Sequence, residues 1–174
     1  MRGSRLFLIV LVIATLLVSL IGCFKKDDQS PDERSAARTS AGGILLKNVL
    51  ASWEAGNKDD AVKQFVSITW TDPSVLEDMP ILSMSEKQFV ALPQDDRTRI
   101  QQEALELTRN LRSLVMHVLS IGDDHAASGD TKTAKKHYGA VRDCGHTLSG
   151  RERLLIIQRF GKLAAAKASQ SASQ

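Results

Sequence analysis

Apolar residues recur every three or four positions through most of the chain after residue 43. The longest run extends from Ile100 to Ile121, where seven apolar residues follow one another at alternating steps of four and three. This spacing places them on one face of a helix. No segment alternates apolar and polar residues for long, as a surface strand would. The pattern therefore predicts an all-α fold. The other segments with the helical period are 45–53, 58–69, 134–141 and 154–163.

Glycine and proline predict where these helices end, because neither residue continues a helix well. The longest helix should begin after Pro93, since Asp95 and Asp96 then lie in its first turn, where negative charge is favourable. The predicted breaks lie at Gly56, Pro73 and Gly129 and near Gly145, and Gly150 should precede the last helix.

Two segments fit the helical pattern less well. Residues 67–70 are rich in strand-forming residues, but they continue an apolar helical face, so we expect them to be helical. Residues 74–93 should contain one short helix that begins at Ser83 or Ser85. Its inward side chains should be Phe89, Val90 and Leu92.

The first 22 residues have the organisation of an export signal. Arg2 and Arg5 precede a nearly uninterrupted apolar run from Leu6 to Leu20. The run ends in Leu-Ile-Gly-Cys at 20–23, which resembles the lipobox of bacterial lipoproteins. The resemblance implies cleavage between Gly22 and Cys23, acylation of Cys23 and anchoring in the lipid bilayer of the bacterial cell envelope.

An uncleaved single-pass anchor is the alternative, since the apolar run is close to the length that spans a bilayer. Both interpretations hold the body at a membrane and outside the cytoplasm. Residues 23–43 lack large apolar side chains after Phe24, so they predict a flexible linker with a reach of about 20–25 Å. The helical body should then cover 44–166, and the small polar residues of 167–174 predict a disordered tail.

Charge and composition exclude one class of partner. The formal net charge of the chain is +3, and it falls to +1 once residues 1–22 are removed. Nucleic-acid binding normally requires a strongly basic surface, and only 5% of the residues are aromatic and able to stack on bases. We therefore expect no nucleic-acid partner.

Two stretches share the same frame of residues. A glycine is followed by alanine five positions later, an aromatic residue nine positions later and an aliphatic residue twelve positions later. Glycine permits a tight turn, and alanine lets two helices approach closely. The frame resembles the second half of a tetratricopeptide repeat, which implies antiparallel helical hairpins that form a groove for a protein or peptide. The matching residues are Gly56, Ala61, Phe65 and Ile68, and then Gly129, Ala134, Tyr138 and Val141.

The spacing departs from that family, because the two glycines are 73 positions apart instead of about 34 per repeat. A degenerate unit within 74–93, an insertion there, and a generic bundle of helical hairpins remain open. Gly122 lies seven positions before Gly129, where the family often has a small residue.

All four histidines lie between His117 and His146, which raises the alternative of a metal-binding or enzymatic envelope lipoprotein. His125, Cys144 and His146 are the candidate metal ligands, although they lack the spacing of a common zinc motif. The chain has no phosphate loop or nucleophile motif. We therefore expect no cofactor and no catalysis. Trp53 and Trp70 should belong to the core, with a partner-binding groove as their alternative.

The sequence thus favours a membrane-anchored adaptor or scaffold that binds a protein or peptide of unknown identity. The competing hypothesis uses the histidine region 117–146, and it requires several of those histidines to converge in space.

Overall fold

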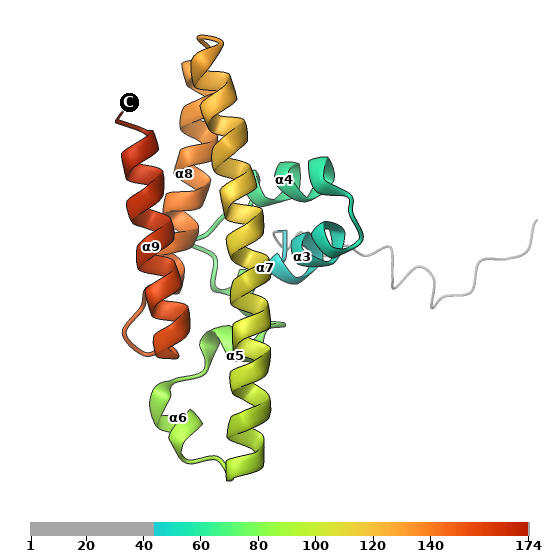
Figure 1. Cartoon of the computed structure of the whole chain (residues 1–174), viewed down its shortest axis with the longest axis vertical. Coiled ribbons are helices and arrows are strands. Elements are labelled where there is room, and N and C mark those ends of the chain that lie inside the picture. Colours follow the sequence, from blue (N-terminus) through green and yellow to red (C-terminus); the bar gives the residue numbers. More distant parts are fainter. Residues whose placement is uncertain (1–43, 174) are drawn as a thin grey trace, which may run out of the picture. The chain divides into compact units, whose positions relative to one another are not determined.

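The computed structural model describes residues 44–173, and within them the chain forms α-helices and one 3-10 helix but no strand (Figure 1). The prediction of an all-α fold is therefore confirmed for these residues. The predictions for the signal 1–22, the linker 23–43, Gly22 and Cys23 lie outside the described residues. The elements are α3 (Leu46–Glu54), α4 (Lys58–Val66), η1 (Pro73–Leu76), α5 (Pro80–Ser83), α6 (Glu86–Val90), α7 (Gln94–Ala127), α8 (Thr131–Leu148) and α9 (Leu155–Ser171).

The three long helices α7, α8 and α9 lie side by side and run in alternating directions (Figure 1). The apolar seam of α7 is turned toward this core, where Leu111, Leu114 and Val118 are fully buried. From α8 and α9, Val141, Leu148 and Ile157 fill the space opposite. Burial of such side chains contributes about 1.5–3 kcal/mol each. The predicted helical period therefore describes the real core face.

The shorter elements pack on α7 at two places. The hairpin of α3 and α4 lies against one side of α7, and a hydrogen bond of 2.7 Å from Asn110 Nδ2 to Glu54 Oε1 joins α7 to α3. The elements η1, α5 and α6 lead from this hairpin to the start of α7 (Figure 1). Ser85 caps α6 through a reciprocal pair of hydrogen bonds with Gln88. Of the two predicted helix starts, Ser83 and Ser85, the structure therefore uses Ser85.

The prediction that residues 67–70 are helical is wrong. Helix α4 ends at Val66, and the chain then exposes Thr69 while burying Ile68 and Trp70 on either side of it. The segment is a pair of turns, in which Ile68 N donates to the carbonyl of Phe65 and Asp72 N donates to the carbonyl of Thr69. Thr147 of α8 stabilises this course by donating a 3.0 Å hydrogen bond to the carbonyl of Trp70.

Three further predictions need correction. The helix expected to stop near Gly145 continues as α8 to Leu148. Val90 does not point inward, because its side chain is 64% exposed, whereas Phe89 and Leu92 are packed against the core. The tail predicted for 167–174 is helical as far as Ser171, the last residue of α9. Ala164 and Ala168, one turn apart, are buried and carry the helix past the predicted end of the body.

Small residues let α8 and α9 approach until their backbones touch. A Cβ atom added to Gly145 would lie 2.5 Å from the amide nitrogen of Ala165 and 2.6 Å from the carbonyl oxygen of Gly161. A Cβ atom on Gly161 would in turn lie 2.7 Å from the carbonyl oxygen of Gly145. Backbone atoms cannot rotate away as a flexible side chain would, so any larger residue pushes the two helices apart.

We predict that Gly145→Ala lowers the free energy of unfolding by about 1–3 kcal/mol, because the added methyl group overpacks the α8–α9 contact. Gly139→Ala is the matched control on the same helix. A Cβ atom there meets nothing within 4 Å, so alanine should raise the stability by up to about 1 kcal/mol. Urea denaturation followed by circular dichroism measures both changes. Equal effects of the two substitutions would contradict the packing described here.

Candidate binding groove

The two helical hairpins begin with the same turn. Gly56, between α3 and α4, has φ 83°, and Gly129, between α7 and α8, has φ 84°. Only glycine adopts this left-handed conformation without strain. The backbone hydrogen bonds match as well, since Asn57 N donates to Ser52 O and Asp130 N donates to His125 O, both at 2.9 Å. The shared sequence frame thus corresponds to a shared turn structure.

The residues that follow each turn occupy equivalent buried positions. Ala61 and Ala134, five positions after the glycines, are 0% and 2% exposed. Phe65 and Tyr138, nine positions after them, are also buried. In the second hairpin the Tyr138 ring covers Gly122, where an added Cβ atom would lie 2.7 Å from the ring. A small residue is therefore required at 122.

The hairpins differ in length, and no third hairpin separates them. Helices α3 and α4 have 9 residues each, whereas α7 has 34 and α8 has 18. The chain at 73–90 forms only η1, α5 and α6, none longer than 5 residues. The idea of a degenerate helical unit at 74–93 is therefore wrong, and this segment is a connection between the hairpins.

A groove of about 450 Å³ lies where α4 meets the α7–α8 hairpin. Its floor is apolar and consists of Val62 and Val66 of α4 together with Ile121 of α7. Lys63 and Lys136 line it from opposite helices, and Asp59 lines it from the start of α4; all three residues are exposed. The groove can therefore accept apolar side chains on its floor and, next to the two lysines, carboxylates at its rim.

The buried side chain of His137 closes the groove at the α8 side. Its Nδ1 atom lies 2.9 Å from the carbonyl oxygen of Thr133, and its ring stacks on His125 with the centroids 5.6 Å apart. The Nδ1 atom of His125 in turn lies 3.5 Å from Oδ2 of Asp130. These contacts fix the end of the α7–α8 hairpin and hold the wall of the groove in place.

The three candidate metal ligands do not come together. Cys144 is fully buried in the core, where burial raises the pKa of its thiol, while His146 of the same helix is exposed. His125 is at the far end of the hairpin, next to Gly129. Within residues 44–173 no three His, Cys, Asp or Glu side chains are placed to hold a metal ion. Of the four histidines only His125 and His137 come together, and within the described residues no further ligand completes a metal site with them.

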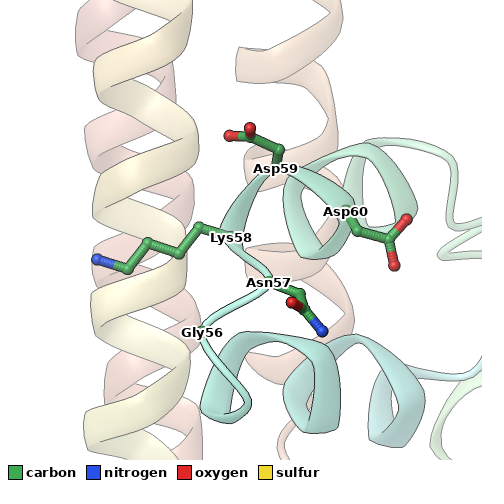
Figure 2. A pocket seen from close by; sticks show the side chains of 5 residues that line it. All are labelled: Gly56, Asn57, Lys58, Asp59 and Asp60. Carbon is green, nitrogen blue, oxygen red and sulfur yellow. The ribbon is translucent and has the colours of Figure 1, made fainter. Parts of the chain in front are cut away.

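Two other depressions lack convergent chemistry. The first borders the turn at 56–60, and Figure 2 shows Lys58, Asp59 and Asp60 pointing in different directions from it. Lys58 instead extends over the ring of Trp53, with Nζ 5.5 Å from the ring centroid. Acidic residues at this helix start favour the dipole and need no ligand to explain them.

The second depression lies beside Trp70, where Arg153 donates from Nε to the carbonyl of Thr147 at 3.1 Å and from Nη1 to the carbonyl of Leu82. Arg153 thus caps the ends of α8 and α5 at once, which is a structural role. Trp70 is 6% exposed and meets Phe65 edge to face at 5.2 Å. The prediction that Trp70 belongs to the core is confirmed.

Sequence reasoning did not single out Lys63, Lys136 or Arg153. The helical period places both lysines on exposed faces, but it does not say which faces lie opposite each other. Only the docking of α4 on α7 and α8 brings the two lysines to one groove.

Comparison with protein-family models, with characterised proteins and with solved structures finds no match for this chain. In the part of the chain from 44 to 173, no helix combines the length and the apolar character needed to cross a membrane.

Tyr138 links the two helices of the second hairpin through its hydroxyl group, which donates a 2.7 Å hydrogen bond to Oδ1 of Asp123. Burial raises the pKa of Tyr138 to about 12, and the hydrogen bond to Asp123 adds to the shift. The folded protein therefore favours the protonated phenol, whose usual pKa is about 10. This contribution to stability is complete below pH 10 and is lost as the pH rises through 12.

We predict that the only tyrosine of the chain ionises with a midpoint closer to pH 12 than to pH 10, followed by ultraviolet absorbance of the tyrosinate. Tyr138→Phe should cost about 1 kcal/mol at neutral pH through the lost hydrogen bond, and it should weaken the decline in stability between pH 10 and 12. A midpoint near 10 in the folded protein would contradict the buried hydrogen-bonded phenol.

Proposed function

We propose that this chain is a bacterial envelope lipoprotein whose helical body binds a segment of another protein in the groove between α4 and the α7–α8 hairpin. The observation that carries the proposal is the groove itself, with an apolar floor between two hairpins and an exposed lysine on either side. A fitting segment presents apolar side chains to Val62, Val66 and Ile121. It carries acidic side chains that pair with Lys63 and Lys136.

The anchor in this proposal is Cys23, at the end of the Leu-Ile-Gly-Cys sequence. Two or three acyl chains hold a protein stably in a bilayer, because each buried methylene group contributes about 0.8 kcal/mol. The predicted linker 23–43 would let the body search within about 20–25 Å of its attachment point. Restricting the search to this layer raises the effective concentration of the groove near a partner in the same envelope. The repeat-like turns at Gly56 and Gly129 support a tetratricopeptide-like adaptor, since that class binds protein segments between helical hairpins.

We predict that a photo-crosslinking residue placed at Lys63 in living cells captures one discrete protein, while the same residue at Gln101 of α7 does not. Both positions are exposed, but only Lys63 lines the groove. Val66→Asp should reduce the adduct at least about fivefold, because it places a charge on the apolar floor of the groove.

Thr69→Asp is the matched control, since it adds the same charge at an exposed residue outside the groove and should leave the adduct unchanged. Equal adducts from positions 63 and 101, or an adduct that survives Val66→Asp, would contradict binding in the groove.

We also predict that Cys23→Ser abolishes incorporation of labelled fatty acid and leaves the apolar run uncleaved. Mass spectrometry of the purified protein distinguishes the forms, because the mature lipoprotein lacks 22 residues and gains acyl chains. A wild-type chain that retains Met1 and carries no lipid would support the uncleaved anchor instead.

A further inference from the structure

Charge is divided unevenly along the helical body. Residues 44–106 contain six Lys or Arg and eleven Asp or Glu, whereas residues 131–173 contain nine Lys or Arg and two Asp or Glu. The near-neutral total therefore conceals a net charge of −5 in the first stretch and +7 in the last. The basic stretch forms α8 and α9.

The outward face of α9 combines positive charge with exposed apolar side chains. Leu155 and Leu163 are 53% and 45% exposed, two of the few large apolar residues that reach the surface of the described body. Arg159 and Lys162 lie between them along the chain, and both are exposed. Because the buried residues of α9 are Ile157, Phe160, Ala164 and Ala168, these four side chains lie on the opposite side of the helix.

This face is separate from the groove. Helix α9 packs on α7 and α8, on the side of α7 away from α3 and α4 (Figure 1). A surface that covers the outward face of α9 would therefore leave the groove between α4 and the α7–α8 hairpin open to a partner.

We infer that the outward face of α9 docks on the surface of an anionic phospholipid bilayer. Arg159 and Lys162 contact the lipid phosphates, and Leu155 and Leu163 enter the boundary between headgroups and acyl chains. Alternation of cations with exposed leucines is the pattern by which surface helices bind such membranes. Nucleic acid would use the charge but not the leucines, and this face has no aromatic residue on which a base could stack.

The inference rests on the proposed anchoring, which keeps the body within reach of a bilayer, but the two can fail separately. Anchoring is measured by flotation of the protein with vesicles, whereas docking of the face is measured by contact of α9 with lipid. Docking adds a second attachment and fixes which way the groove faces.

The experiment uses the full-length protein with a fluorophore at Ala166→Cys, reconstituted into vesicles that carry a quencher at the headgroup level. Ala166 is exposed and lies on the same face as Arg159 and Lys162, one turn beyond Lys162. Ala51→Cys is the control position, because Ala51 is exposed and belongs to α3, the helix that Figure 1 shows on the side of α7 away from α9. Cys144 is fully buried and stays unlabelled in the folded protein, and Cys23 has no free thiol in the proposed lipidated form.

We expect quenching at position 166 in vesicles that contain phosphatidylglycerol, little quenching in phosphatidylcholine alone, and little at position 51 in either. Each cation near an anionic surface contributes about a fivefold preference, so Arg159→Gln with Lys162→Gln should shift docking about 30-fold toward the free state. The matched control Lys47→Gln with Lys87→Gln removes two exposed cations from other elements and should leave the quenching unchanged.

Failure of the label at 166 to be quenched in phosphatidylglycerol vesicles would overturn the inference, whether or not the protein floats with them. Equal quenching at 51 and 166 would overturn it too, because the body would then have no preferred face. Quenching at 166 that is equally strong in phosphatidylcholine vesicles would also overturn it, because the lipid charge would then play no part in docking.

Discussion

The contact between α8 and α9 at Gly145 and Gly161 is the constraint on which the rest of the body depends. It holds the two backbones so close that a single added carbon atom would meet main-chain atoms within 2.6 Å. Because α8 also packs on α7 and on α4, its position determines the wall of the groove that Lys136 and His137 provide. It also determines which side of α9 is buried and which side is left for another surface.

The body therefore has two sides with different physical character, separated by α7. On one side the short hairpin of α3 and α4 closes an apolar groove against the long hairpin of α7 and α8. On the other, α9 presents cations and exposed leucines. The proposed adaptor would use this separation, because a surface that holds the body to a bilayer must not cover the one that binds its partner.

Much of the fold follows from local rules that the sequence displays directly. The apolar seam from Ile100 to Ile121 predicts α7, because apolar residues at steps of three and four line up only on a helix. Gly56 and Gly129 predict their turns, because a positive φ favours glycine. The predictions failed where tertiary contacts determine the end of a helix. At 67–70 the side chain of Thr147 replaces helical hydrogen bonds, and at 167–171 buried alanines extend α9. The groove could not be predicted, since helical period does not specify which faces meet.

Native-state hydrogen exchange tests the central role of the α8–α9 contact most directly. If the rest of the body depends on it, the slowest amides belong to α8, α9 and the second half of α7, and they exchange only by global unfolding. The hairpin of α3 and α4 and the connection at 73–90 should open at lower free energy, because they pack on that unit from outside. Slowest exchange in α3 and α4, with α9 opening first, would contradict this account.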